Sequence, residues 1–396
     1  MPKRLRIAYA MINCNRRDGS ARALNELAER MAKLHDVHLF ARRVEELDLS
    51  GIRWRQMAGI GWPAVLDFTT YHLLADFRIR PKDFDIIHSI GCNAIAANVI
   101  TIQNIQPAKR HFLDVETGNI SWARKLTRRM FLDITTWAEY RVYPAHPKRQ
   151  PPLFLPVSRG VEKELRKFYP IEASPVKIIP NGADTSKFKP LDDADRVRWR
   201  RENGIANAEI LLVFVGGEWS RKGLDLAIRA LGKLNRPTVK LVVLGKDADQ
   251  SRFKTLAQEY QVASQVLFLG FRSDVATALA AGDIFLFPSW YEAFSLATIE
   301  AAACGLPIVA TEINGAEDFI IPGETGLFIR HDPEQIAATI DPLIRSEAER
   351  RRMGRNARQL VEQSYTWDHI AESTERAYLE YLESRQARRR ETMEIR

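Results

Sequence analysis

Short apolar runs alternate with longer amphipathic stretches along the whole chain of 396 residues. Apolar runs of this length predict buried parallel strands, and stretches with a period of about 3.6 residues predict the helices between them. One set of predicted strands covers residues 5–12, 37–41, 85–91, 98–104, 153–158 and 176–182. A second set covers residues 210–217, 239–245, 265–270, 283–289, 306–311 and 326–329. Two sets of this size predict two doubly wound α/β domains.

The segment NGADTSKFKPLDD, residues 181–193, follows a predicted strand and mixes glycine, proline and charged residues, as linkers do. We therefore expect a first domain at 1–185, a second at 186–370, and a C-terminal helix at 371–396 that returns to the first domain. The long helical pattern begins near Thr366 and ends in a charged tail that we expect to be frayed. Near the other end of the chain, Ser20 is the expected N-cap of a helix.

The composition is typical of a globular protein, with 45% apolar and 27% charged residues. The first residues have too short an apolar core for a secretory signal, and no apolar run is long enough to span a membrane. Three widely spaced cysteines, Cys14, Cys92 and Cys304, predict neither a disulfide framework nor a zinc site. We therefore expect a cytoplasmic protein.

The net charge of +8 is unevenly distributed. Residues 1–180 hold 29 Lys and Arg against 18 Asp and Glu, whereas residues 181–396 hold 29 against 32. The excess is typical of a protein with an anionic partner, such as acidic lipid or a phosphorylated saccharide, and equally of a merely soluble basic surface. Within the basic half, cations alternate with aromatic residues between Lys109 and Phe131, but no nucleic-acid motif accompanies them.

The first candidate site follows the predicted strand at 210–217, where Gly216 and Gly217 allow a tight turn. Arg221 and Lys222 come next, at the carboxyl edge of the sheet, where doubly wound folds bind their ligands. Two adjacent cations there can neutralise a pyrophosphate, although such residues before a helix are often only surface charges.

The second candidate site contains two glutamates, Glu292 and Glu300, around a helix start predicted near Phe294. The backbone amides of Phe294, Ser295 and Leu296 would be the free donors of the first turn and could bind an anion. Glu292, at the lip of the site, can accept hydrogen bonds from a sugar, and Glu300, deeper, can accept those of a ribose. The alternative interpretation is that Glu292 only interacts with the helix dipole and that Glu300 is an exposed helix residue.

The stretch PSWYEAFSLATIEAAACGLPIVAT, residues 288–311, resembles the signature of the retaining glycosyltransferases of family 4, whose hallmark is E-x7-E. Further pieces that resemble the family occur in the family's order: LPVSRGVEKEL, IIPNGADTSKF, FVGGEWSRKGLDLAI, VLFLGFRSD, NGAEDFI and YTWDHIA. The resemblance covers residues 85 to 382, with a weaker match before them.

This resemblance implies a GT-B fold: two Rossmann-like domains facing a central cleft. It also implies transfer of a hexose from a UDP- or GDP-linked sugar to a saccharide or lipid-linked acceptor, with retention at the anomeric carbon. The catalytic residues would be Arg221 and Lys222, on the donor diphosphate, and Glu292, on the donor sugar. Donor binding would use Phe271 and Arg272 near the nucleobase, the amides of Phe294, Ser295 and Leu296 on phosphate, and Glu300 on the ribose.

The resemblance further implies that the nucleotide sugar is a co-substrate and that no metal or other cofactor is needed, because cations and helix N-termini do the work of a metal. The expected partners are the nucleotide sugar and the acceptor, without nucleic acid. The basic first half suggests one further partner, the anionic inner face of the membrane.

Three positions carry the remaining expectations. Gly19 resembles the glycine that approaches the donor phosphates, although an ordinary turn at Asp18–Gly19 fits equally well. Gln103 stands where many relatives have a histidine near the reacting sugar, and Gly217 where many have an arginine. His88 and His111 fit core or surface positions better than catalytic ones.

Two rival functions stay open: a GT-B epimerase or hydrolase, and a catalytically silent GT-B module that binds a glycan or lipid. The E-x7-E pattern disfavours the first. Gln103 is the one hint of the second.

Overall fold

The computed structural model describes residues 4–16, 18–112, 122–144 and 150–394. The described chain divides into two compact units. The first holds residues up to 111, those from 122 to 181, and those from 367 on, and the second holds Phe112 and residues 182–366. Apart from the change at His111–Phe112, the chain passes between the units at Asn181–Gly182 and Thr366–Trp367, a few residues before each expected boundary.

The first unit is built on a parallel sheet of six strands with the order β5-β3-β1-β6-β7-β8. The strands are β1 (Arg6–Ala10), β3 (Asp36–Ala41), β5 (Ile52–Gln56), β6 (Ile86–Ile90), β7 (Val99–Ile102) and β8 (Leu153–Pro156). A short ladder joins β2 (Asn13–Cys14) to β4 (Arg43–Val44). This is the Rossmann order, and the strand order reverses between β1 and β6.

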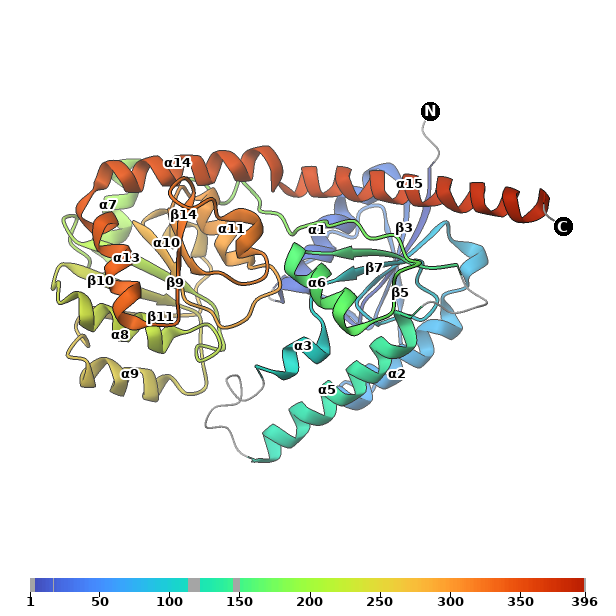
Figure 1. Cartoon of the computed structure of the whole chain (residues 1–396), viewed down its shortest axis with the longest axis horizontal. Coiled ribbons are helices and arrows are strands. Elements are labelled where there is room, and N and C mark those ends of the chain that lie inside the picture. Colours follow the sequence, from blue (N-terminus) through green and yellow to red (C-terminus); the bar gives the residue numbers. More distant parts are fainter. Residues whose placement is uncertain (1–3, 17, 113–121, 145–149, 395–396) are drawn as a thin grey trace. The chain divides into compact units, whose positions relative to one another are not determined.

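Helices cover both faces of this sheet (Figure 1). In that view α1 (Gly19–Leu34) and α15 (Trp367–Glu394) lie above the sheet, and α2 (Ala64–Arg78) and α5 (Trp122–Val142) lie below it. The short elements η1 (Pro81–Asp83), α3 (Gln106–Arg110) and α6 (Arg159–Phe168) complete the described part of the unit. The charged tail, expected to be frayed, is helical through Glu394.

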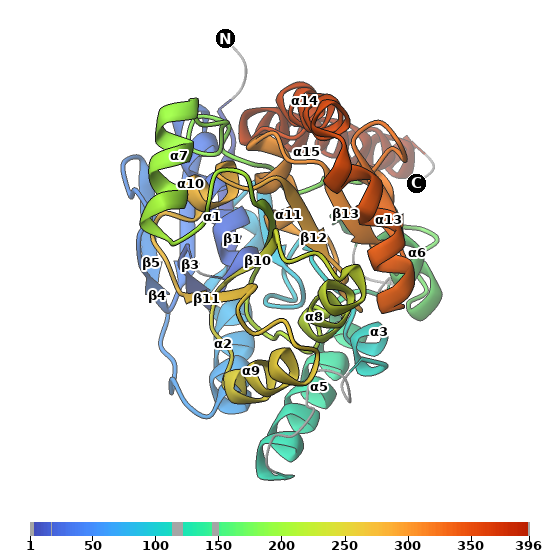
Figure 2. The same cartoon turned by 90° about the vertical axis from the view of Figure 1, so that its left-hand side faces the viewer.

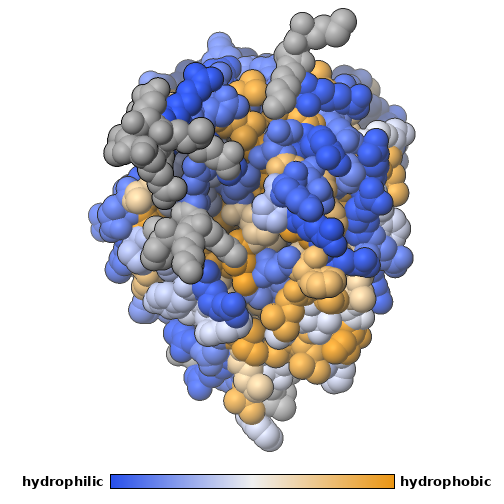
Figure 3. All heavy atoms as spheres, turned by 90° about the vertical axis from the view of Figure 1, so that its right-hand side faces the viewer, coloured by the Kyte–Doolittle hydropathy of each residue, from blue (hydrophilic) through white to orange (hydrophobic). Residues whose placement is uncertain are grey.

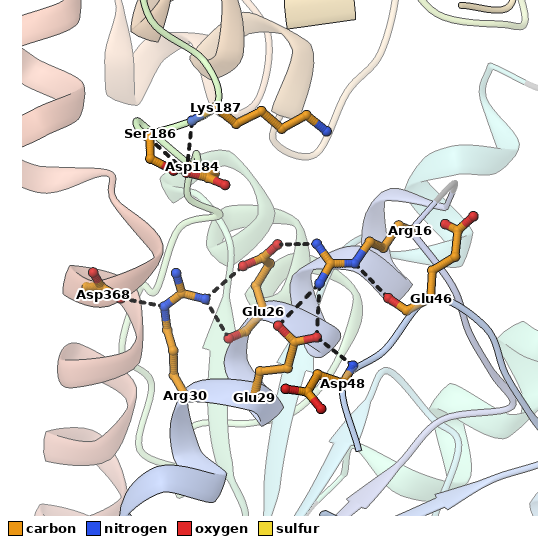
Figure 4. Close-up of polar contacts among 10 residues, drawn as sticks. All are labelled: Arg16, Glu26, Glu29, Arg30, Glu46, Asp48, Asp184, Ser186, Lys187 and Asp368. Atoms are coloured by element: carbon orange, nitrogen blue, oxygen red, sulfur yellow. Dashed lines mark hydrogen bonds and ion pairs between the residues drawn. The ribbon is translucent and has the colours of Figure 1, made fainter. Parts of the chain in front are cut away.

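Polar contacts hold α15 against the first unit. Arg30 of α1 lies between Glu26 and Asp368, at 2.7 and 2.6 Å, and Arg16 of the preceding loop pairs with Glu29 at 3.0 Å (Figure 4). The pair of Arg30 and Asp368 thus joins the start of the last helix to the first helix of the chain, 338 residues earlier, and the other two pairs hold Arg30 and Arg16 in place on α1.

The second unit repeats the same architecture, with the strand order β11-β10-β9-β12-β13-β14. Its strands are β9 (Ile210–Val215), β10 (Val239–Leu244), β11 (Val266–Gly270), β12 (Ile284–Phe287), β13 (Ile308–Thr311) and β14 (Gly326–Ile329). Its helices are α7 (Asp193–Glu202), α8 (Leu224–Leu234), α9 (Gln250–Glu259), α10 (Val275–Ala280), α11 (Leu296–Ala303), α12 (Ala316–Phe319), α13 (Pro333–Arg345) and α14 (Glu347–Ser364). Within this unit, α14 packs on α11 and α13 on α8 (Figure 2).

Four local expectations were wrong. Residues 176–182 run beside β8 and Ile179 still donates to the carbonyl oxygen of Pro156, but the ladder stops after the bridge at Val176 because Pro156 of β8 has no N–H to donate back. The edge strand β5 was not predicted, since all but the first of its residues are exposed and it has no apolar run. The N-cap of α1 is Asp18, whose side chain accepts from the amide of Ser20. Helix α11 begins at Leu296, two residues later than expected.

Candidate functional site

The loop after β9 brings the first candidate residues to the reversal of strand order in the second sheet. Gly216 has a φ of +133°, and a Cβ there would lie 2.6 Å from Cε of Lys222, so glycine leaves room for the lysine side chain. Gly223, with a φ of +74°, precedes α8, and a Cβ there would lie 2.0 Å from the carbonyl oxygen of Pro288. The loop therefore packs directly against the end of β12, next to β9 in the sheet.

This packing brings Arg221, Lys222 and Glu292 together. The Oε1 atom of Glu292 accepts from Nη1 of Arg221 at 3.0 Å and from Nζ of Lys222 at 2.9 Å. Arg221 also donates to both Glu218, at 2.8 Å, and the carbonyl oxygen of Tyr291, at 2.5 Å. All three predicted catalytic residues thus form one cluster at the carboxyl edge of adjacent strands.

The cluster determines the charge state of Glu292. Burial by itself would raise the pKa of this carboxyl, but the adjacent Lys222 and Arg221 outweigh burial and lower its pKa to about 2. Glu292 is therefore ionised at neutral pH. Burial opposes the charge of Arg221, yet Glu292 and Glu218 raise its pKa, and the ammonium of Lys222 lies 4.6 Å from the centre of the Phe287 ring.

Neighbouring backbone contacts fix the loop that carries Glu292. The amide of Trp290 donates to the carbonyl oxygen of Arg221 at 2.9 Å, and the carbonyl of Ser289 accepts from Thr311 at 2.5 Å. The ring of His331 stacks on Trp290 with a centroid distance of 3.8 Å, and its Nε2 lies 3.0 Å from the same Ser289 carbonyl. The sequence reasoning missed Glu218 and His331, because neither belongs to the E-x7-E pattern.

The start of α11 differs in detail from the expectation. Ser295 is the N-cap and its hydroxyl accepts from the amide of Thr298, so the free first-turn amides belong to residues from Leu296 on. The side chain of Phe294 is buried and stacks with Tyr365. A small cavity touches Glu292, Ser295 and Thr298 together, so the cluster and the helix start border the same space.

Neither glutamate is exposed. The side chain of Glu292 is only 14% exposed, so it is not at an open lip of this unit. Glu300 is 5% exposed, and the alternative of an exposed helix residue is therefore wrong.

The remaining predicted residues of the second unit do not join this cluster. Phe271 is exposed after β11, where an aromatic face is accessible. Arg272 instead pairs with Asp274 at 2.6 Å and lies over the ring of Trp199. Gly217 approaches the carbonyl oxygen of Lys246, since a Cβ there would lie 3.2 Å from it.

In the first unit, Gly19 is the exposed first residue of α1, directly after its N-cap. Gln103 follows β7 and exchanges two amide hydrogen bonds with Asn181, at 3.0 and 3.3 Å. Asn181 was quoted within IIPNGADTSKF but not recognised as its partner. His88 lies in the core between Tyr378 and Thr101, and burial lowers its pKa to about 3, whereas His111 is exposed.

A buried carboxyl that the sequence did not reveal holds the loop after Gln103. Glu139 of α5 is 2% exposed and accepts from the amide of Gln106, the first residue of α3, at 3.1 Å. It also accepts from the hydroxyl of Tyr169 at 2.5 Å. Burial raises the pKa of Glu139 to about 8, although both hydrogen bonds act in the opposite direction.

Comparison with known families gives two matches. The model of "Glycosyltransferase Family 4" matches residues 17–187, and that of "Glycosyl transferases group 1" matches residues 195–360. The two matches fall one in each half of the chain and do not overlap.

Curated relatives are similar over part of their length. An uncharacterized glycosyltransferase of Methanocaldococcus jannaschii is 30% identical over 227 residues, which cover 56% of this chain and 58% of the relative. The D-inositol 3-phosphate glycosyltransferase of Stackebrandtia nassauensis is 31% identical, covering 55% and 51%. The lipopolysaccharide glucosyltransferase WaaG of Escherichia coli is 33% identical, covering 42% and 45%. The chain thus spans about half the length of the curated relatives it matches.

Solved structures match nearly the whole chain. WaaG superimposes with a TM-score of 0.76 at 21% identity, covering 93% of this chain and 98% of that one. HepE of Anabaena, in complex with UDP and glucose, gives a TM-score of 0.72 at 17% identity, covering 94% and 99%. At these identities the likeness concerns the fold. The structures show the GT-B fold, and the two family models, one matching each half of the chain, identify it as similar to the family 4 glycosyltransferases.

Proposed function

We propose that this protein transfers a hexose from a UDP- or GDP-linked sugar to a saccharide or lipid-linked acceptor, with retention at the anomeric carbon. The observation that carries the proposal is the cluster of Arg221, Lys222 and Glu292 at the strand-order reversal of the second sheet. A relative of the same fold, HepE, has been crystallised with UDP-glucose, which makes a nucleotide-diphosphate sugar the natural donor to test first.

In this proposal the two cations neutralise the donor diphosphate, the role that a metal ion has in other transferases. Lys222 and Arg221 leave Glu292 as the diphosphate takes its place, and the freed carboxylate then lies close to the donor sugar. A negative charge there stabilises the positive charge that develops at the anomeric carbon. The bond from that carbon to the leaving phosphate breaks, and the bond to the acceptor oxygen forms on the same face. The acceptor proton goes to the leaving phosphate, so no base from the chain is required at Gln103.

The test is release of hexose from UDP- and GDP-hexoses, followed with the purified protein in the presence and absence of a chelator. Slow hydrolysis without acceptor and retained configuration of the new bond, read by NMR, are expected. A protein that binds the nucleotide sugars but never cleaves them would be the silent binding module, and an inverted product would refute retention. Loss of hydrolysis on chelation would refute the metal-independent part of the proposal.

We also propose that the first unit docks peripherally on anionic membrane. Large apolar side chains are exposed on α2 and along α5, two helices that pack on each other. They are Leu66, Leu73 and Phe77 on α2 and Trp122, Leu126, Met130, Trp137 and Tyr140 on α5. Apolar side chains also gather in the lower part of the face in Figure 3, at the height of α2 and α5 in Figure 1. No described helix is sufficiently long and apolar to span a bilayer.

Cations accompany this apolar face. Arg128 and Arg129 are exposed on α5, and Arg141 lies over the ring of Trp137 at 4.8 Å. Residues 113–121, in the middle of the predicted basic aromatic stretch, and the side chain of Arg124 lie outside the described residues. Exposed apolar area flanked by Lys and Arg is the chemistry that binds anionic bilayer surfaces.

The test of docking is co-sedimentation with vesicles of phosphatidylglycerol or phosphatidylcholine at low and high salt. Binding to the anionic vesicles that weakens with salt is expected, and F77S/L126S should reduce it. The control L34S/I321S replaces two exposed apolar residues elsewhere. Equal binding of both double variants, or no binding at low salt, would refute docking through this face.

A further inference from the structure

A basic pocket lies at the edge of the second sheet opposite the Glu292 cluster. Asp283 and Pro307, which precede β12 and β13, line it, so it lies at the amino ends of these strands. The cluster around Glu292 lies at their carboxyl ends. The hollow has a volume of about 300 Å³, the lower end of the range for small-molecule sites.

The lining of this pocket has an excess of positive charge. Five arginines line it against three carboxylates, which leaves a formal charge of +2. The arginines are Arg196, Arg350, Arg351, Arg355 and Arg358, and the acids are Asp193, Asp283 and Glu347. The C-terminal half of the chain has a net charge of −3, with 29 basic and 32 acidic residues from 181 on. The lining is therefore more positive than the half of the chain to which it belongs, and one of its arginines, Arg358, pairs with Glu362 just outside it.

The inner wall of the pocket has too few anions for its cations. Asp283 pairs with Arg196 at 2.7 Å and with the fully buried Arg200, and it lies 3.9 Å from Arg350. The side chain of Arg350 is 10% exposed, and its hydrogen bonds go to the carbonyl oxygens of Leu343 and Ile344. One carboxylate thus lies within 4 Å of three guanidinium groups. The hydrogen bonds of Arg350 go to uncharged carbonyl oxygens.

The outer wall of the pocket has exposed arginines that are available to bind a ligand. Arg351 pairs with Glu347, but both side chains are more than 60% exposed, and such a pair contributes little. Arg355 is also exposed, and its side chain has no hydrogen bond or ion pair among the described residues. Guanidinium groups bind phosphate oxygens in pairs, with geometry that few other anions match.

We propose that this pocket binds a small polyvalent anion of the phosphate class, a free phosphate or diphosphate or the phosphate ester of a small metabolite. The site is separate from the donor site but shares a helix with it. Arg358 donates to the carbonyl oxygen of Ala303 at the end of α11, and Cys304 and Gly305 line the pocket. The start of the same helix, at Ser295, borders the cavity beside Glu292.

The test is calorimetric titration of the full chain with inorganic phosphate, pyrophosphate and a hexose 6-phosphate at constant ionic strength. The variant R351Q/R355Q removes the two exposed pocket cations. The control R198Q/R345Q removes two arginines that are equally exposed, each with an acidic partner in its own helix, and that do not line the pocket.

The wild-type protein and the control are expected to bind at least one of the three anions at a site whose affinity falls at least tenfold in R351Q/R355Q. The anion bound most tightly distinguishes free phosphate from an ester. Pyrophosphate binding at the donor cluster does not depend on these arginines, so it stays the same in all three proteins. If none of the three anions binds at a site that R351Q/R355Q weakens, the proposal is overturned. The proposed transferase activity is then untouched, because the donor cluster does not use these arginines.

Discussion

The buried carboxyl of Glu139 makes the stability of the first unit depend on pH in a way that one substitution should remove. The pKa of Glu139 rises from its ordinary value of 4.5 to about 8, with burial as the main cause. One pKa unit corresponds to about 1.4 kcal/mol, so ionising Glu139 costs about 5 kcal/mol more in the folded than in the unfolded chain. The substitution E139Q keeps the shape and removes the ionisation.

The sign follows from the direction of the shift. A group with a raised pKa in the folded state contributes its full stabilisation below pH 4.5 and loses it as the pH rises towards 8. Between pH 5 and 8 the stability of the wild-type unit relative to E139Q should therefore fall by about 1.4 kcal/mol per pH unit, or about 4 kcal/mol in all. Other titrating groups are common to both proteins and cancel in the difference.

The assay is hydrogen exchange of the amides of α5, measured by mass spectrometry at pH 5, 6, 7 and 8. Both proteins are compared at the same pH, so the intrinsic exchange rates cancel and the protection factors give the difference in opening free energy. E172Q, at an exposed position, is the control for loss of a carboxyl. Parallel profiles of wild type and E139Q over this pH range would refute the reasoning, because they would mean that Glu139 is ionised in the folded protein at neutral pH.

Three further predictions concern the second unit. E300Q should weaken binding of free UDP or GDP. E292Q removes the carboxylate that holds Arg221 and Lys222, so it should not weaken nucleotide binding but should lower the rate of transfer. Calorimetry beside turnover tests this, and the reverse pattern would exchange the two roles. K222A should lower turnover about tenfold for each 1.4 kcal/mol of diphosphate interaction lost, and an unchanged rate would remove Lys222 from the site. G223A should destabilise the unit by at least about 2 kcal/mol in urea unfolding, because its Cβ meets a carbonyl oxygen at 2.0 Å, whereas G204A, with a similar φ but open space, should cost only about 1 kcal/mol; equal costs would contradict the packing argument.

The sequence predicted those parts of the fold that depend only on residues close together along the chain. The runs at 210–217 and 283–289 are predicted as strands because each contains an unbroken stretch of apolar residues, ILLVFV and IFLF, that a turn follows. The same locality explains why Arg221 and Lys222 were expected between a strand and a helix. It also explains the errors at β5 and at residues 176–182. An exposed edge strand has no apolar run, and the apolar segment at 176–182 cannot complete a ladder because its neighbour in β8, Pro156, has no N–H.

The assembled site, in contrast, depends on tertiary structure. Glu292 is 70 residues from Lys222 in the chain, and they meet only because β12 lies beside β9 in the sheet. The pairing of Gln103 with Asn181 spans 78 residues, and the hydrogen bond from Tyr169 to Glu139 spans 30. Burial and charge environment are properties of the packed chain, so the ionised state of Glu292 and the raised pKa of Glu139 have no signal in the order of the residues. The sequence by itself determined which groups are available, and the packing decided which of them meet and in which charge state.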